Sequence, residues 1–183
     1  MSITELQNTD ETLWMQTAQE TLAVAADAIR RVSTRLTPDF LRALEVLERC
    51  EGKVITCGVG KSGIVARKIA ATLTSTGCPS VFLHPSEALH GDLGIVEPDD
   101  AVIALSNSGE SEELLTILPA LLARRVPLIA IVGNLQSTLA KRATVVLDSA
   151  IEREACPLNL APTTSVIVHI CTCRLEDRIQ LIH

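Results

Sequence analysis

Five short apolar runs, most of them rich in valine and isoleucine, recur between residues 54 and 147. They are Val54–Cys57, Ser80–Leu83, Ala101–Leu105, Leu128–Val132 and Thr144–Leu147. Segments with helical patterning separate most of these runs, at residues 62–76, 111–124 and 136–142. Alternation of buried strands with helices is typical of a parallel sheet that is covered on both faces. The chain is therefore predicted to be α/β, a three-layer sandwich with a five-stranded parallel sheet flanked by helices.

The first 50 residues have helical patterning and no strand signal. Apolar residues recur there at steps of three and four, which places them on one helix face: Trp14, Ala18, Leu22, Ala25, Ile29 and Val32. Pro38 begins a second helix, which ends near Gly52. We expect residues 1–50 to form a helical hairpin that packs on a single domain at residues 51–165.

Net charge and composition limit the kinds of molecule that the chain is expected to bind. Hydrophobic residues make up 47% of the chain and charged residues 21%, which is typical of a globular protein. The net charge of -6 argues against nucleic acid as the main partner, because nucleic-acid-binding domains usually have a basic face. A small anionic ligand fits better.

Localisation and metal binding are judged from the apolar runs and the cysteines. No run reaches the roughly 20 residues that a membrane helix needs, and the polar start does not resemble a signal peptide, so a cytoplasmic protein without membrane contact is expected. The six cysteines show no CxxC spacing of the kind found in metal sites, so no bound metal is predicted. No cofactor is predicted either. Cys57, inside an apolar run, is expected to be a reduced core thiol.

Two loops have residues suited to binding an anion, and both follow predicted strands. The first, GVGKSG, contains Gly60, Lys61 and Ser62 and leads into a helix. Its glycines allow close approach of a ligand, and the helix amides favour negative charge. It is not a Walker A loop, and the second strand ends in His84 rather than in the acidic residue of a dinucleotide site. Alone, this loop indicates a turn and a site about equally.

The second loop, SNSGES, gives the stronger signal. Ser106, Ser108 and Ser111 surround Asn107 and Gly109 just before a helix. One serine is explained by helix capping. Three hydroxyls beside free amides predict a cradle for a phosphate monoester. In open parallel sheets, ligands bind beyond the carboxyl ends of the strands, where both loops are expected.

Two further polar stretches follow strands. HPSEALHGDLG, residues 84–94, contains His90 in what we expect to be a long loop. EREACPLNLAPTTS, residues 152–165, contains Glu154 in a segment too irregular for a regular helix. Each residue has a simpler interpretation, since a lone histidine is more often structural and a loop carboxylate is often only solvated.

Together these stretches resemble the sugar isomerase (SIS) domain of bacterial D-arabinose 5-phosphate isomerases. The resemblance covers about residues 51–164 and rests on GVGKSG, STGCPSVFLHPSEALHGDLG, SNSGESEEL and EREACPLNLAPT. It implies a metal-independent interconversion of D-ribulose 5-phosphate and D-arabinose 5-phosphate, whose product feeds the synthesis of Kdo for lipopolysaccharide or capsule. It also implies a homo-oligomer, either dimer or tetramer.

The resemblance assigns roles to particular positions. Ser62, Ser106, Ser108 and Ser111 would hold the phosphate of a pentose 5-phosphate. Catalysis would use Lys61, Glu113, Glu154 and His90.

The chemistry agrees with these residue types. A carboxylate of raised pKa can move the proton between carbons, and a lysine can stabilise the enediolate. We expect Glu154 to be the base, Lys61 the electrostatic stabiliser and Glu113 a shuttle or orienting group. Glu113 is also explained by its place in the first turn of a helix, where acids are favourable.

After Ser165 the sequence departs from the family pattern. The stretch 166–183 has no HPGG turn with its further catalytic histidine, and no pair of CBS domains follows. We expect a truncated or divergent C-terminus and impaired turnover. The alternative is a non-catalytic SIS module that binds a sugar phosphate as a sensor; the presence of both Lys61 and Glu154 favours the enzyme. Nucleotide binding is a poorer third interpretation.

Overall fold

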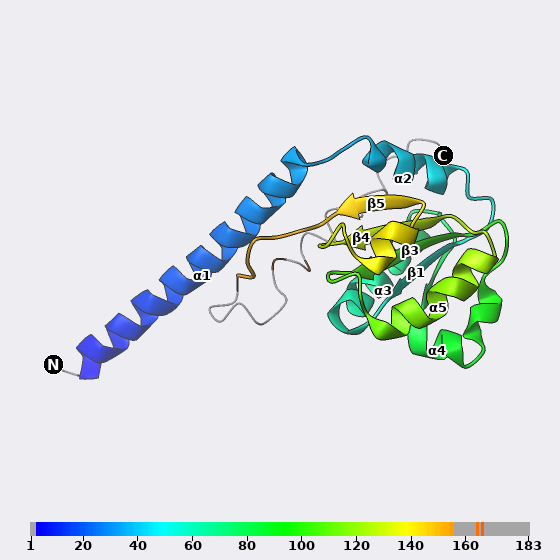
Figure 1. Ribbon diagram of the computed structural model, residues 1–183. Helices are drawn as coiled ribbons and strands as arrows, with labels where there is room; N and C mark the ends of the chain where they lie inside the picture. The colour runs from blue at the N-terminus through cyan, green and yellow to red at the C-terminus, as the bar shows by residue number, and fades with distance from the viewer. Residues whose placement is uncertain (1–2, 156–163, 165, 167–183) are drawn as a thin grey trace.

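The computed structural model, which describes residues 3–155 together with 164 and 166, contains the predicted sheet (Figure 1). Five parallel strands lie in the order β2-β1-β3-β4-β5. Their bounds are β1 Val54–Gly58, β2 Ser80–Leu83, β3 Ala101–Ser106, β4 Leu128–Val132 and β5 Val145–Asp148. Each strand begins and ends within one residue of its predicted bounds, so the α/β prediction is confirmed.

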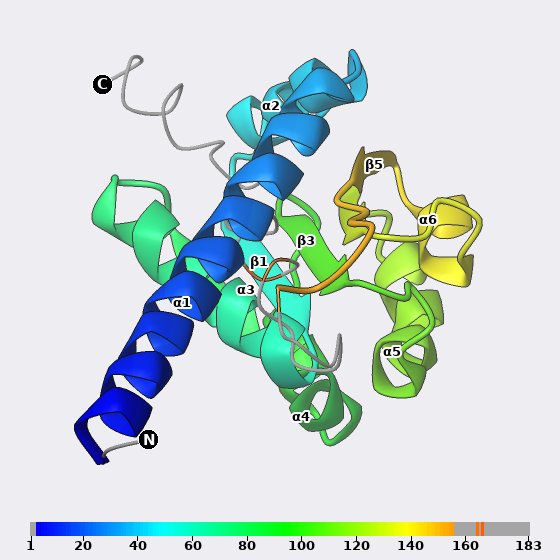
Figure 2. The same ribbon diagram turned by 90° about the vertical axis from the view of Figure 1, so that its left-hand side faces the viewer.

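Helices cover both faces of the sheet. The helical elements are α1 Ile3–Thr34, α2 Asp39–Glu48, α3 Gly60–Ser75, α4 Pro85–Leu89, the 3₁₀ helix η1 Asp92–Ile95, α5 Glu112–Ala123 and α6 Thr138–Arg142. Successive residues of β3 alternate between the two layers, since Ile103 packs with residues of α2 and α3 whereas Val102 packs with residues of α5. Figure 2 shows α2 and α3 on one side of the sheet and α5 and α6 on the other.

The strand order reverses between β1 and β3. From β1 the chain passes through α3 to β2 on one side, whereas from β3 it passes through α5 to β4 and then through α6 to β5 on the other. Gly58 at the end of β1 is in register with Leu105 near the end of β3. The loops that follow these two strands therefore emerge side by side at a topological switch point, where ligands bind in open α/β sheets.

Both predicted N-terminal helices are present, in a more open arrangement than a closely packed hairpin. Figure 1 shows α1 projecting away from the sheet while α2 lies over it. Of the predicted apolar stripe on α1, Ala25 and Val32 are buried, but Trp14 is 66% and Leu22 71% exposed. The buried residues of the stripe thus lie toward the C-terminal end of α1, and Trp14 and Leu22 precede them.

The prediction of a loop over residues 84–94 is wrong for most of that stretch. Helix α4 occupies 85–89 and η1 occupies 92–95. His84 caps α4 by accepting the amide of Ser86 at Nδ1 (3.2 Å), and Pro85 occupies the first turn, where its missing N–H costs nothing. Ala88 is buried in the core, which fixes the helix to the domain.

A buried carboxylate closes the amino edge of the sheet. Asp100, 1% exposed, accepts the backbone amides of Lys53 and Glu97 (2.8 Å each) and the Lys53 ammonium (2.9 Å). Burial alone would raise the pKa of Asp100, but these hydrogen bonds outweigh it and hold the pKa below its ordinary value. Asp100 thus ties the start of β1 to the turn before β3.

The predicted tail at 166–183 lies almost entirely outside the described residues, as does the boundary at 165. Of the helices in the described part of the chain, none combines the length and hydropathy needed to cross a membrane.

Candidate active site

The loop between β1 and α3 brings backbone amides to the switch point. Gly60 has a φ of +56°, a conformation that side chains disfavour. A Cβ on Gly63 would lie 2.6 Å from the carbonyl oxygen of Gly58, so glycine is needed for the helix to begin this close to the strand. Val59 provides no side-chain cap, and the first turn of α3 contains no acidic residue. Lys61 is exposed there, and Ser62 is half-buried.

The serine loop between β3 and α5 is organised by its own hydroxyls. The Ser106 hydroxyl, which is buried, lies 2.9 Å from the Ser111 hydroxyl and accepts the amide of Gly109 at 3.0 Å. Gly109 has a φ of +67°, and a Cβ there would lie 2.1 Å from Oγ of Ser137. Only glycine therefore fits at this turn. Ser108 is exposed, and its hydroxyl accepts the amide of Glu110 at 3.2 Å.

The helix starts at the switch point differ from two others in the molecule. Helix α4 is capped by His84 and α6 by the hydroxyl of Ser137. Ser111 occupies the capping position of α5, yet its side chain makes no capping hydrogen bond and turns to Ser106 instead. The first amides of α3 and α5 are thus left without a side-chain cap, which is the arrangement that binds phosphate groups at helix N-termini.

Sequence reasoning missed how the serine loop is anchored. Oε1 of Glu110 accepts the amide of Thr138 at 2.6 Å, and the carbonyl oxygen of Asn107 accepts the amide of Gly133 at 2.9 Å. These bonds tie the loop to the region between β4 and α6. No local sequence pattern identifies them, because the partners of Glu110 and Asn107 lie more than 25 residues further along the chain.

The remaining candidate residues follow strands at the same edge. Glu113 is half-buried in the first turn of α5, and His90 is exposed directly after α4, in the connection that follows β2. Glu154 is half-buried in the segment that follows β5. The structure places Lys61 and the serines on adjoining loops; the catalytic roles of these residues stay predictions.

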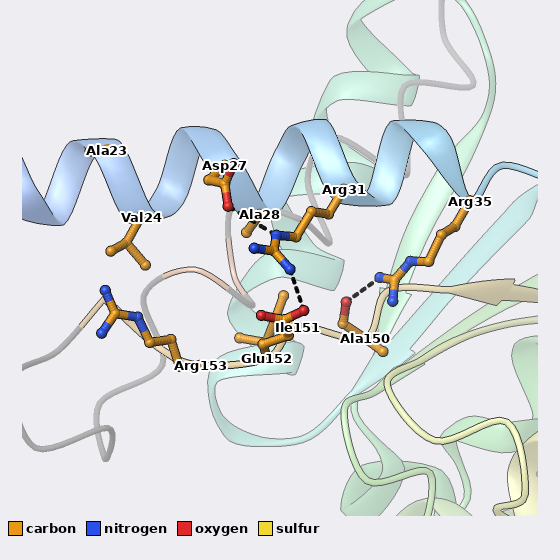
Figure 3. Close-up of a pocket in the computed structure, with 10 residues that line it drawn as sticks. All are labelled: Ala23, Val24, Asp27, Ala28, Arg31, Arg35, Ala150, Ile151, Glu152 and Arg153. Carbon is orange, nitrogen blue, oxygen red and sulfur yellow. Dashed lines mark hydrogen bonds and ion pairs between the residues drawn. The ribbon is translucent and has the colours of Figure 1, made fainter.

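A cavity of about 460 Å³ lies between α1 and residues 150–153, just before Glu154 (Figure 3). Its lining combines small apolar residues of α1 with arginine and carboxylate side chains. Ala23, Val24, Asp27, Ala28, Arg31, Arg35, Ala150, Ile151, Glu152 and Arg153 form it. This hollow therefore adjoins the Glu154 segment and involves the N-terminal helix.

Neither a metal site nor a reactive thiol is seen among the described residues. No group of three or more His, Cys, Asp or Glu side chains there could hold a metal ion. Cys57 is buried in β1, and burial raises the pKa of its thiol to about 12, as expected for an inert core cysteine.

Comparison with known proteins gives the relationship directly. The SIS domain family model matches residues 48–175. Arabinose 5-phosphate isomerase KdsD of Pseudomonas aeruginosa PAO1 is 49% identical over 155 residues, covering 85% of this chain and 48% of the relative. Arabinose 5-phosphate isomerase GutQ of Salmonella typhimurium is 48% identical, covering 84% of this chain and 48% of the relative. The chain thus spans about half the length of these curated relatives.

A solved structure matches over nearly its whole length. The E. coli CFT073 protein c3406, in complex with arabinose 5-phosphate, is 37% identical and superimposes with a TM-score of 0.86, covering 100% of this chain and 93% of that one. The topology, the glycine and serine loops at the switch point, and the family match over most of the chain agree. The chain belongs to the SIS domain family.

Proposed function

We propose that this chain interconverts D-arabinose 5-phosphate and D-ribulose 5-phosphate through an enediol intermediate. The observation that carries the proposal is the similarity to c3406, whose solved chain, in complex with arabinose 5-phosphate, is matched over 93% of its length. The names and the identity of the curated relatives support it further.

The phosphate of the substrate would bind at the serine loop. The Ser106 and Ser111 hydroxyls already lie 2.9 Å apart, and Ser108 and Ser62 are on the same pair of loops. The uncapped amides of α5 and α3 would complete the oxyanion contacts. In this arrangement, the sugar carbons would extend toward Lys61, whose charge would stabilise the negative oxygen of the enediolate.

The proton transfers are redox-neutral and balance within the substrate. A base removes the proton from C2 of the aldose while the C1 oxygen gains one, which gives the enediol. The hydroxyl on C2 then loses its proton as C1 receives one, which gives the ketose. We assign the carbon-directed base to Glu154, with Glu113 and His90 as the groups that move protons between oxygens.

The test is exchange of the C2 proton of D-arabinose 5-phosphate in heavy water, followed by NMR together with ketose formation. Exchange with ketose formation supports the isomerase, and Glu154→Gln should abolish both. Ligand-induced shifts without exchange or ketose would overturn catalysis and leave a sugar-phosphate-binding module. An unchanged protein spectrum at millimolar ligand would overturn the phosphate site as well.

We also propose a homo-oligomer that buries the exposed apolar side chains of α1 between residues 13 and 22. Four large apolar side chains in this part of α1 are more than half exposed, and exposed apolar groups of this kind mark interaction sites. They are Leu13, Trp14, Met15 and Leu22. Light scattering coupled to size exclusion should give a dimer or tetramer for the wild type and a smaller species for Trp14→Glu/Leu22→Glu. Glu11→Lys on the same part of the helix is the control, and a monomeric wild type at micromolar concentration would refute the assembly.

We propose that residues 51–165 form the catalytic unit, that the protein works in the cytoplasm, and that its product supplies Kdo synthesis. The free thiols of Cys50, Cys57 and Cys78 agree with a reducing compartment. Restored Kdo synthesis in a bacterium that lacks its own arabinose 5-phosphate isomerases would support the pathway.

A further inference from the structure

Arg31 of α1 and Arg35, one residue beyond the end of α1, reach across to the segment that follows β5 (Figure 3). The Arg31 guanidinium pairs with the carboxylate of Glu152 and, through Nε, with Asp27 on its own helix at 2.9 Å. The Arg35 guanidinium donates to the carbonyl oxygen of Ala150. These contacts join residues that lie 121 and 115 positions apart in the chain.

Arg31 and Arg35 hold the segment after β5 at two neighbouring residues, and we call this pair of contacts the clamp. Arg31 lies in the last turn of α1, and Arg35 follows in the turn just beyond the end of the helix at Thr34, where its amide bonds to the carbonyl oxygen of Val32 at 3.0 Å. Their partners, Glu152 and Ala150, are two residues apart in the chain. Figure 3 shows both arginines directed from the helix toward this segment.

The clamp acts on the stretch that leads directly to Glu154. At the start of this stretch, Ser149 still bonds to the sheet through the carbonyl oxygen of Val132 (2.9 Å). At its end, Ala155 donates to Oγ1 of Thr164 at 2.9 Å. Between these two points Arg31 and Arg35 contact the chain at residues 152 and 150, so the path of the segment depends on where the C-terminal end of α1 lies.

The contacts are too exposed to contribute much stability. The Arg31 and Glu152 side chains are 55% and 73% exposed, and ion pairs at such sites are weak. The Arg35 side chain, 42% exposed, bonds to the carbonyl oxygen of Ala150 and has its Nε 3.8 Å from a carboxylate oxygen of Asp148, and such exposed contacts are weak as well. A positioning role fits such contacts, because a misplacement of about 1 Å in an active site can lower turnover about a hundredfold.

We propose that Arg31 and Arg35 are positioning residues that hold residues 150–152 against α1 and thereby set the position of the Glu154 carboxylate. The inference rests on the proposed isomerase function and on Glu154 as its base. It makes the N-terminal helix part of the active-site framework, although α1 lies outside the sheet and its loops.

The kinetic test compares Arg31→Gln, Arg35→Gln and Glu152→Gln with Arg30→Gln, an exposed arginine on the same turn. We expect kcat to fall about tenfold in the first three and more in the Arg31→Gln/Arg35→Gln double variant. KM for D-arabinose 5-phosphate should stay within about twofold, because the phosphate cradle is untouched. The charge exchange Arg31→Glu/Glu152→Arg should recover most of the lost kcat. Unchanged kcat in the double variant, or a loss seen only in KM, would overturn the inference while the isomerase proposal stands.

A second measurement does not depend on activity. Trypsin cleavage at the Arg153–Glu154 bond, followed by mass spectrometry, reports how firmly the segment is held. We expect at least about threefold faster cleavage in the double variant than in the wild type or Arg30→Gln. If the wild type lacks isomerase activity, the proposed function fails and this rate still decides whether the clamp exists. Equal cleavage rates would refute it.

Discussion

Polar groups are buried and paired at the amino edge of the sheet, where the strands begin, and exposed at the carboxyl edge, where the strands end. At the amino edge, Asp100 is buried, and three donors from Lys53 and Glu97 bond to it. At the carboxyl edge, Lys61 and Ser108 are exposed, and two helices begin without a side-chain cap. Buried polar groups are normally paired within the protein, whereas groups left open at a cleft are available to a ligand.

This difference predicts that residues at the amino edge contribute mainly to stability and residues at the carboxyl edge mainly to catalysis. Substitutions at the amino edge should change the free energy of unfolding and leave turnover unaffected. Substitutions at the carboxyl edge should do the reverse, except where a side chain, such as Ser106, orders the loop and is also proposed to contact the ligand.

Lys61→Ala should give the largest effect on catalysis. We expect kcat/KM to fall about 10²–10³-fold, because Lys61 is the proposed electrostatic stabiliser of the developing negative oxygen. Lys61 is exposed, so the thermal midpoint should not move measurably. Steady-state kinetics and calorimetry check this, with Lys68→Ala, an exposed lysine of the same helix, as the matched control. A loss of activity that tracks a loss of folded protein would contradict the separation of the edges.

Asp100→Asn should give the largest effect on stability. The substitution removes the charge that the Lys53 ammonium and two amides stabilise, and it turns one acceptor into a donor facing them. We expect a loss of about 3 kcal/mol in the free energy of unfolding, measured by urea titration. The kcat of the remaining folded protein should be unchanged. Asp99→Asn, at the exposed neighbour, should cost almost nothing, and a comparable loss there would show that the buried bonds are not the cause.

The sheet could be predicted closely from sequence, because buried strands of a parallel sheet read as continuous apolar runs. The runs at β2 and β4 match the structure residue for residue. Helix α4 was missed because it has only five residues, and its start depends on a histidine cap, which is not a common sequence signal.

Only the parts of the candidate site that lie within local sequence motifs could be predicted from the sequence. The glycine and serine loops were identified because each combines special backbone requirements with polar side chains within six residues. The bond from Thr138 to Glu110 and the contacts of Arg31 and Arg35 connect distant segments. An exposed arginine or glutamate carries no sign in the sequence of which partner it will meet, so these had to come from the structure.

Ser106→Ala should affect both properties, each moderately. Its hydroxyl accepts the Gly109 amide and lies beside the Ser111 hydroxyl. We expect KM for D-arabinose 5-phosphate to rise about tenfold and stability to fall by about 1–2 kcal/mol. Ser137→Ala is the comparison, since that buried serine caps α6; it should lower stability by about 1 kcal/mol and leave KM within twofold. Equal changes in KM for both variants would mean that the serine loop has no direct contact with the phosphate.

The smallest expected effect is the pH dependence of the stability that Asp100 contributes at the amino edge. The pKa of Asp100 lies below its ordinary value of 3.8, so its ionised form is favoured by folding. Such a group contributes stability that is fully present above its unfolded pKa and is lost as the pH falls through its folded pKa. The difference in unfolding free energy between wild type and Asp100→Asn should therefore be constant from pH 7 to 5 and shrink only below about pH 4. Urea titrations at pH 7, 5, 4 and 3 measure this difference directly. A wild-type advantage that grows between pH 7 and 5 would mean that burial, rather than the three hydrogen bonds, dominates at Asp100, because a carboxyl group whose pKa is raised by folding adds stability as it takes up a proton.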